Sequence, residues 1–595
     1  MSTRGRGNFV KLTLLALLVT FAFLLLFSSL HSSDLELQEL NLKDARQRQM
    51  EEQELEQPRT ENDTPTQVGK ATPPPVRTVE EPVDEELVMQ LENELPEVDY
   101  GFWYRYAKPG KYAMNNNCAR YPDPLDLQLH NIYWQTFNNA NVTFRLYSAY
   151  VDMRTGIKSR GVVRILATAN QIGVAFPVTH CHLWYAGHNK PITVQISNFV
   201  SVWIKSWGYK PLLSYPHLLS CPVPDALPPN VILKTPSTIS LVSSPCEHAT
   251  NSLRIHYEQP NNTISTSSQL HALNATSRRQ LSFGVCVKGF DFPYIDLSAR
   301  LIEWFELQRL LGASRIYAYM YDVHPAVQRV LDYYQRTGYL ELRPLTMANG
   351  MPRLRQYQHM LIQQRRLIKR LNELIPYNDC FYRNMYRHDY LLNADIDEVI
   401  MPLGALRTWQ EILDTDQALT LKNCPNGFVS LCFINTYFTK VVPEALNHEQ
   451  LEADELYVLQ HTMRHQNYSL PNRATKCFHN TRYSETLHNH FTLKWLKGGC
   501  QPRTIDVKFA QMQHYREPDN KYNHSELVED RNAWKYAPEL RAAVEQVWMH
   551  LDDVQGQNVD TEDQGMLEEL QDHESDLEQA QEQLQMLQQA QVSKT

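Results

Sequence analysis

The spacing of hydrophobic positions changes from one region of the chain to the next. Residues 12–30 form an uncharged apolar run that is long enough to cross a bilayer. Residues 31–97 are rich in Gln and Glu and then in Pro and Thr, a composition typical of an extended polar stem. Between residues 98 and 260, short apolar or alternating runs are separated by Pro, Gly and Asn. This pattern predicts a β-rich accessory domain, which we expect to be a sandwich.

A different pattern follows a Ser/Thr/Asn-rich linker at residues 261–280. From Phe283 on, apolar runs that suit strands alternate with helical spacing, so we assign residues 281–545 to one α/β domain. Its longest predicted helix covers residues 354–375 and ends at Pro376, before the buried strand predicted within residues 389–402. Alternating strands and helices predict a mostly parallel sheet covered by helices on both faces. Ligands of such sheets bind beyond the carboxyl ends of the strands.

The tail, residues 546–595, is acidic and rich in Gln and Glu. Leu570, Leu577 and Leu584 recur at seven-residue spacing, but so few heptads favour a solvated acidic helix over a coiled coil. Either the stem or this C-terminal helix could join copies of the chain into a homo-oligomer.

Charged residues on either side of the apolar run predict how the chain is oriented. Arg4, Arg6 and Lys11 precede the run, and acidic residues follow it. The positive-inside rule therefore leaves residues 1–11 as a cytoplasmic tail and places everything after residue 30 on the other side of the membrane. A cleaved signal peptide is the alternative, but the run is longer than a typical signal core and no small-residue cleavage site closes it. We expect an uncleaved type II anchor.

The cysteines and glycosylation motifs agree with that orientation. All 10 cysteines follow the predicted anchor, and their spacing matches no zinc motif, so we expect disulfides in an oxidising compartment without predicting which cysteines pair. The N-x-S/T motifs also lie on that side, at Asn62, Asn141, Asn261, Asn274, Asn467 and Asn523.

Charge narrows the range of partners. The net charge of −10 excludes a generally basic nucleic-acid-binding protein, and we expect no nucleic-acid partner. The acidic excess is concentrated in the stem and the tail, which leaves a basic body between them. A basic body favours an anionic ligand.

Candidate chemistry is concentrated where the buried strand of residues 389–402 meets acidic residues. Asp395, Asp397 and Glu398 form a D-x-D-E cluster. Paired carboxylates suit Mg²⁺ or Mn²⁺, which can bridge a diphosphate. A second D-x-D, Asp414 to Asp416, follows no predicted strand and is interpreted as a capping or turn feature.

Three ordered segments resemble glycosyltransferase family 92. They are LIEWFELQRLLGASRIYAYMYD at residues 301–322, NDCFYRNMYRHDYLLNADIDEVIMP at residues 378–402, and HYRE at residues 514–517. The resemblance implies a GT-A fold and a Golgi membrane enzyme that uses a nucleotide sugar. It further implies metal-dependent, inverting transfer of a hexose, galactose from UDP-galactose in a β linkage, to a glycan acceptor on glycoproteins.

The resemblance also suggests roles for individual residues. Asp395 and Asp397 would hold Mn²⁺ (or Mg²⁺) and the diphosphate, with His514 as a third ligand. His488 and His490 are its rivals. Asp322 matches a position that contacts the nucleoside, although a helix N-cap before Pro325 is nearly as good an interpretation.

Basic residues and the general base are less well defined by the sequence. Lys288, Arg353 and Arg355 lie near predicted strand ends and could meet diphosphate charge, but a solvated surface is the favoured interpretation. An inverting transfer needs a base, for which Glu398 and Glu485 are the candidates. Strand alternation would point Glu398 away from Asp397, so it could be structural.

Two alternatives to this function stay open on the sequence alone. One is the same fold with another nucleotide-sugar donor. The other is a non-catalytic glycan-binding or scaffold protein of the secretory pathway, in which the β-rich domain does the binding.

Overall fold

The computed structural model describes residues 84–108, 118–258, 279–348, 354–440, 456–516 and 526–552, apart from a few short loops within them. The predicted anchor, most of the stem, most of the linker and the heptad leucines lie outside the described residues. Among the residues that are described, no helix has both the length and the apolar character that a membrane span requires. All of them belong to one compact unit that begins at Pro82.

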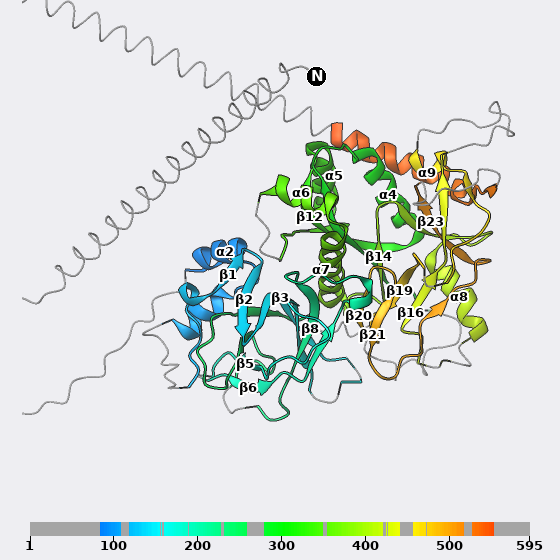
Figure 1. Ribbon diagram of the computed structural model, residues 1–595. Helices are drawn as coiled ribbons and strands as arrows, with labels where there is room; N and C mark the ends of the chain where they lie inside the picture. The colour runs from blue at the N-terminus through cyan, green and yellow to red at the C-terminus, as the bar shows by residue number, and fades with distance from the viewer. Residues whose placement is uncertain are drawn as a thin grey trace, which may run out of the picture. The chain divides into compact units, whose positions relative to one another are not determined.

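The β-rich part contains the strands labelled β1, β2, β3, β5, β6 and β8 in Figure 1, and together with β4, β7, β9 and β10 they form one ten-stranded sheet. Its main path runs β6-β5-β9-β10-β3-β4-β8-β7, and β2 and β1 branch from β3. The strands are β1 (Leu129–Asn131), β2 (Trp134–Asn139), β3 (Val142–Asp152), β4 (Val162–Ala169), β5 (His180–Trp184), β6 (Ile192–Gln195), β7 (Asn198–Ser201), β8 (Tyr215–Pro222), β9 (Thr238–Val242) and β10 (Leu253–His256).

This sheet folds back on itself. Strands β5 and β8 are far apart along the path, yet Cys181 of β5 is disulfide-bonded to Cys221 of β8. Apolar residues from β2, β3, β4, β5, β8, β9 and β10 share one core. The two halves therefore face each other across that core, which is the arrangement of a sandwich built from one continuous sheet.

The α/β part contains a seven-stranded sheet with the order β13-β12-β11-β14-β19-β16-β22. The first four strands are mutually parallel, whereas β19 runs antiparallel to both neighbours. The strands are β11 (Phe283–Phe292), β12 (Ala313–Val323), β13 (Leu340–Pro344), β14 (Tyr390–Ala394), β16 (Ser430–Phe433), β19 (Lys476–Asn480) and β22 (Arg503–Thr504). The α/β class is confirmed, and the parallel half lies N-terminal in the sequence.

Helices cover both faces of the parallel half. Alternate residues of β11 and β12 pack with α4 (Ser298–Leu311) and α5 (Pro325–Arg336) in one core. The residues between them, including Cys286, Tyr317 and Tyr319, pack with α7 (Arg366–Asn384) in another. The period of two along each strand therefore divides its side chains between two helical layers.

The strand expected within residues 389–402 is divided between two sheets. Strand β14 ends at Ala394, and β15 (Glu398–Pro402) begins a five-stranded sheet with the order β15-β23-β17-β18-β24. The other members are β17 (Asn435–Thr439), β18 (Met463–His465), β23 (Ala510–Tyr515) and β24 (Leu527–Glu529), and β20 (Ser484–Leu487) and β21 (Thr492–Trp495) form a separate hairpin. Residues 395–397 are the turn between the sheets.

The long helix was predicted with the wrong ends. The structure has two helices, α6 (Arg355–Gln364) and α7, which meet at a non-helical Arg365, and α7 continues through Pro376. A proline inside a helix costs about 3 kcal/mol because one backbone hydrogen bond is lost. Residues 374–384 are all buried, and Cys380 is bonded to Cys286 of β11, so tertiary packing outweighs that cost.

The predicted disulfides are confirmed, and all cysteines are paired. The pairs are Cys118–Cys246, Cys181–Cys221, Cys286–Cys380, Cys424–Cys500 and Cys432–Cys477. None of them joins the β-rich part to the α/β part. Those two parts are instead joined by a shared aromatic core, in which Trp134 and Tyr150 of the β-rich part pack with Tyr319 and Phe381.

The predicted boundaries of the stem and the tail need correction. Residues assigned to the end of the stem form α2 (Glu85–Glu94), which precedes the short α3 (Tyr100–Phe102), and Val88 is buried. At the other end, helical residues 537–552 cross the predicted boundary and bury Val544 and Val547 in the α/β core. Polar composition concealed both segments because only a few apolar side chains of each are buried.

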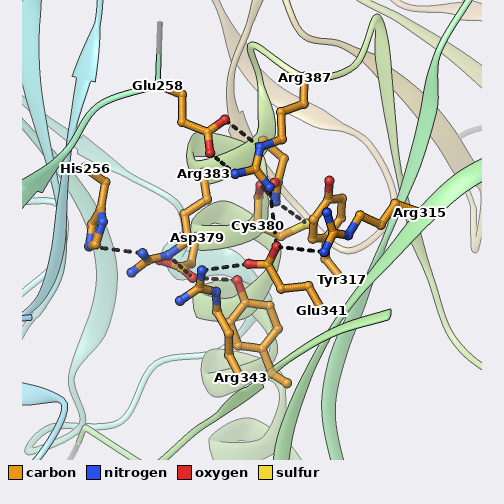
Figure 2. A network of polar contacts seen from close by, with 12 residues as sticks. His256, Glu258, Arg315, Tyr317, Glu341, Arg343, Asp379, Cys380, Arg383 and Arg387 are labelled. Atoms are coloured by element: carbon orange, nitrogen blue, oxygen red, sulfur yellow. Dashed lines mark hydrogen bonds and ion pairs between the residues drawn. The ribbon is translucent and has the colours of Figure 1, made fainter. Parts of the chain in front are cut away.

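Glu97, at the predicted end of the stem, joins the parts of the fold. Its carboxylate lies 2.6 Å from Arg383 of α7 and 2.9 Å from His256 of β10. Arg383 also contacts Asp379 and His256 in the polar network of Figure 2. Burial acts to raise the pKa of Glu97, but Arg383 and His256 outweigh it and hold that pKa well below its usual range.

We expect Glu97→Gln to lower the free energy of unfolding by about 3 kcal/mol at pH 7, because a buried ion pair loses one partner. A depressed carboxyl pKa contributes stability that is fully present above the unfolded value of 4.5 and is lost as the pH falls below it. The difference from the wild type should therefore shrink progressively below pH 4.5. Urea unfolding between pH 7 and pH 3 measures both effects.

Glu85→Gln is the matched control. Glu85 pairs with Arg105 at the surface, where its side chain is 65% exposed, and such pairs contribute less than about 1 kcal/mol. The role of Glu97 would be contradicted if Glu97→Gln lowered the free energy of unfolding no more than Glu85→Gln does. A loss of stability that stays constant with pH would also contradict it.

Candidate functional site

The acidic turn lies at the carboxyl end of β14, next to the parallel strand β11. The backbone N–H of Asp395 donates to the Glu398 carboxylate at 3.1 Å, and the N–H of Glu398 donates to the Asp395 carbonyl at 3.0 Å. The turn is therefore closed by its own residues, and its carboxylates are held at the sheet edge where α/β proteins bind ligands.

Asp395 is surrounded by cationic and hydroxyl groups. Its carboxylate lies 3.0 Å from Lys288 Nζ and 3.6 Å from Lys476 Nζ, and it accepts a hydrogen bond from the Tyr377 hydroxyl at 3.0 Å. Burial acts to raise the pKa of Asp395, but Lys288 and Lys476 outweigh it and hold that pKa far below its usual range. These contacts favour the charged form of the Asp395 carboxylate.

Asp397 and His514 form a second pair within the site. His514 lies on β23, opposite Glu398 of β15, and its Nε2 is 3.4 Å from Asp397 Oδ2. Its ring is stacked on Tyr437, with the ring centres 5.0 Å apart. Although burial acts to raise the pKa of Asp397, His514 lowers it overall. The structure thus brings His514 to the acidic turn.

Glu398 points into the protein. Its carboxylate is buried, lies 3.0 Å from Lys476 Nζ and accepts the Asp395 N–H, and burial raises its pKa. His514 also reaches this carboxylate, because its Nδ1 lies 3.9 Å from Glu398 Oε1 while its Nε2 faces Asp397. These contacts support the structural interpretation of Glu398.

The two lysines are the part of the site that sequence reasoning missed. Lys288 was expected on a solvated surface, but it bridges Asp395 and Glu373 of α7. Lys476, on β19, was not singled out at all and is only 1% exposed. The available signal was weak, because Lys476 begins a short strand that also contains His479 and Asn480; a lysine that is buried in such a strand is rarely without an anionic partner.

The charges around the turn do not balance. Three carboxylates, those of Glu373, Asp395 and Glu398, pair with two ammonium groups, and a fourth, that of Asp397, pairs with His514. The cluster therefore has an excess of two negative charges when His514 is neutral. One divalent cation would neutralise it.

The arrangement of donors is compatible with such a cation only in part. Asp397 and His514 are adjacent, and oxygen and imidazole ligands suit Mn²⁺. Asp395 directs its oxygens towards the lysines, and within the described part of the chain no group of three Asp, Glu, His or Cys side chains is arranged to hold a metal ion.

The rival histidines lie elsewhere. His488 packs on Trp207 with ring centres 4.3 Å apart, and His490 Nδ1 lies 3.2 Å from the carbonyl of Thr475. Of the three histidines considered, His514 has the contact to Asp397. Glu485 is likewise outside the acidic turn, since its carboxylate lies 3.0 Å from Arg164 of the β-rich part.

Asp322 lies near the end of β12, and the helix-cap interpretation is wrong. The side chain of His324, not Asp322, accepts the N–H that caps α5. The Asp322 side chain is partly exposed near the carboxyl end of the strand, and it lies 3.4 Å from the exposed Arg355.

A cavity of about 130 Å³ adjoins the acidic turn through Lys288. Asp291 of β11 lines it and is 7% exposed. Its Oδ1 is 3.1 Å from His359 Nδ1, whereas its buried Oδ2 makes no hydrogen bond to any described residue. A Cβ at Gly289 would fall 2.5 Å from the Tyr321 ring, so glycine lets that ring form a wall of the cavity.

The acidic turn and the cavity lie at the carboxyl ends of parallel strands, which is where α/β proteins bind their ligands. Residues 282–558 match the model of glycosyltransferase family 92. This match supports a glycosyltransferase and covers the acidic turn, both lysines, His514 and the cavity. Among curated proteins, the search found no significant match to the chain.

We expect Lys476→Met to lower the free energy of unfolding by about 3 to 5 kcal/mol, because it leaves buried carboxylates without their ammonium partner. Lys494→Met is the control, since Lys494 is exposed on β21, and it should change stability by less than about 0.5 kcal/mol. Urea unfolding at pH 7 compares the two. Equal midpoints would contradict a structural role for Lys476.

Proposed function

We propose that the chain is a type II Golgi membrane enzyme that transfers galactose from UDP-galactose to a glycan on a glycoprotein, with inversion and with a divalent metal. The family match supports the glycosyltransferase class. The observation that carries the finer proposal is the acidic turn after β14, with its excess of two negative charges beside a cavity. A metal–diphosphate complex is the kind of ligand that such a turn suits.

The sheet supports a GT-A-like domain. Its four parallel strands are adjacent, and the acidic turn follows the fourth of them in chain order, β14. The antiparallel strands that come later in the sequence extend the sheet on the other side of β14, where we place the acceptor half of the domain.

Asp397 and His514, with Asp395 beside them, would hold Mn²⁺ or Mg²⁺. The bound cation would neutralise charge on the departing nucleoside diphosphate. Lys288 is a second source of positive charge, because its side chain is partly exposed and adjoins both Asp395 and the cavity. The chain's own role is to hold these groups fixed before the donor binds.

The cavity is our candidate for part of the donor site. The unpaired Oδ2 of Asp291 can accept a hydrogen bond from a ribose hydroxyl or from a nucleobase N–H. Asp322 is adjacent to Asp291 across the strand pair and is more exposed. Asp322, which the family resemblance suggested, and Asp291, which the structure adds, are therefore both candidates for the nucleoside contact.

For the general base we retain Glu485, because the Glu398 carboxylate is committed to Lys476 and to the turn backbone. A base must be able to approach the acceptor hydroxyl. The Glu485 side chain is partly exposed, so an acceptor can approach it. Its carboxylate would then contact the acceptor hydroxyl as well as Arg164.

The function is tested with the full chain and a panel of UDP-sugars, with and without Mn²⁺, by measuring UDP release and transfer to a glycan array. We expect UDP-galactose turnover that needs the metal, and a loss of at least about 100-fold in Asp397→Asn. Asp414→Asn changes the other D-x-D, on α8 (Trp409–Thr420), and should leave turnover unchanged.

Three other outcomes of these assays would favour an alternative function or contradict the metal site. Turnover of another nucleotide sugar would favour the same fold with a different donor. No metal-dependent turnover by the wild type, with glycan binding retained, would favour the scaffold alternative. Equal activity of Asp397→Asn and Asp414→Asn would contradict the proposed metal site.

Asp291→Asn should weaken UDP binding about tenfold, because an amide replaces one acceptor oxygen with a donor and mispairs with the nucleoside. Isothermal titration with UDP measures this without turnover. Asp322→Asn is measured alongside it, and the larger loss identifies the nucleoside contact. Unchanged affinity in Asp291→Asn would exclude the cavity as the donor site.

A further inference from the structure

The β20–β21 hairpin is held from two sides. On one side, Asn378 of α7 donates to the Leu487 carbonyl and accepts from the Leu487 N–H, both at 2.9 Å. On the other side, Arg164 of the β-rich part pairs with Glu485, and Arg154 donates to the carbonyls of residues 481 and 484. The hairpin therefore lies between α7 and the β-rich part.

The turn of this hairpin, residues 488–491, contacts one aromatic side chain of the β-rich part. Trp207, in the short helix η3 (Lys205–Trp207), lies 4.3 Å from the His488 ring and 6.1 Å from the Phe491 ring. The His488 carbonyl accepts a hydrogen bond from Asn393 of β14, two residues before Asp395. The turn thus links Trp207 to the strand that carries the acidic cluster.

The same turn fixes the buried lysine. Lys476 Nζ donates to the Asn489 side-chain oxygen at 2.5 Å, and that ammonium group also lies 3.0 Å from Glu398 and 3.6 Å from Asp395. An ammonium group with three donors is oriented by its acceptors. Displacement of Asn489 would therefore change how Lys476 is shared between the two carboxylates.

We propose that Trp207 is a positioning residue for the acidic cluster: it holds the turn of residues 488–491, so that Asn489 fixes Lys476 against Asp395 and Glu398. The β-rich part then acts as a fixed support of the catalytic centre. For its effect on catalysis this inference rests on the proposed function. The structural coupling itself does not.

Hydrogen–deuterium exchange of the full chain tests the coupling without any turnover. In Trp207→Ala, backbone amides of residues 484–495 and of 476–480 should exchange at least about tenfold faster than in the wild type. Trp207→Phe keeps a ring against His488 and should restore most of the protection. Tyr209→Ala is the control, because Tyr209 is exposed and stacks on Tyr215 within the β-rich part.

A double-mutant cycle makes the result decisive even if Trp207→Ala loosens the β-rich part. Asn489→Ala removes the Lys476 contact without touching that part. If Trp207 and Asn489 act through one turn, their effects should not multiply. The exchange rate of residues 476–480 in the double variant should then stay within about twofold of the rate in the more affected single variant. Multiplicative effects of the two substitutions, or exchange confined to the β-rich part, would overturn the proposal.

If the wild type turns over UDP-galactose, kinetics provide a second test. Trp207→Ala should lower kcat about tenfold and raise the Mn²⁺ concentration for half-maximal rate, and Trp207→Phe should reverse both. A purely structural loss would lower the active fraction and leave that concentration unchanged. Failure of the wild type to turn over any donor would contradict the proposed function, while the exchange data would still decide the coupling.

Discussion

The fold depends on the burial of one carboxylate, that of Asp379 in α7. A fully buried charge must be paired, and Asp379 is paired by Arg383 one turn later and by the hydroxyls of Tyr150 and Tyr319. Tyr150 belongs to the β-rich part and Tyr319 to the parallel sheet. Satisfying this single charge therefore fixes α7 between the two parts and explains why that helix continues past Pro376.

The same helix extends this constraint to the site. Near its middle, Tyr377 donates to Asp395 and Asn378 clamps the hairpin, while Glu373 pairs with Lys288. The acidic turn is thus supported from α7, from β11 and from β19. Its formal charges are balanced only in part, and that residual negative charge is the reason why we propose a cation there.

The β-rich part provides more than a spacer between the α/β part and the stem. Its ion pairs and its aromatic contact are made to the hairpin whose turn orients Lys476. A rigid support of this kind keeps charged groups in place in a site where water would otherwise have to reorganise. The N-terminal segment is part of the same assembly through Glu97.

The sequence by itself determined the α/β class, the alternation of strands and helices, and the acidic residues at a strand end. It also determined that the cysteines form disulfides, although not which cysteines pair. These follow from local periodicity, from composition and from a short motif. Tertiary structure decided what local rules could not. It carried α7 through Pro376, packed residues of the expected stem, and placed Lys288 and Lys476 against Asp395. The physical reason is that burial and charge pairing act between residues far apart in the chain, such as Lys476 and Asp395, and a sequence pattern does not report which distant side chains meet.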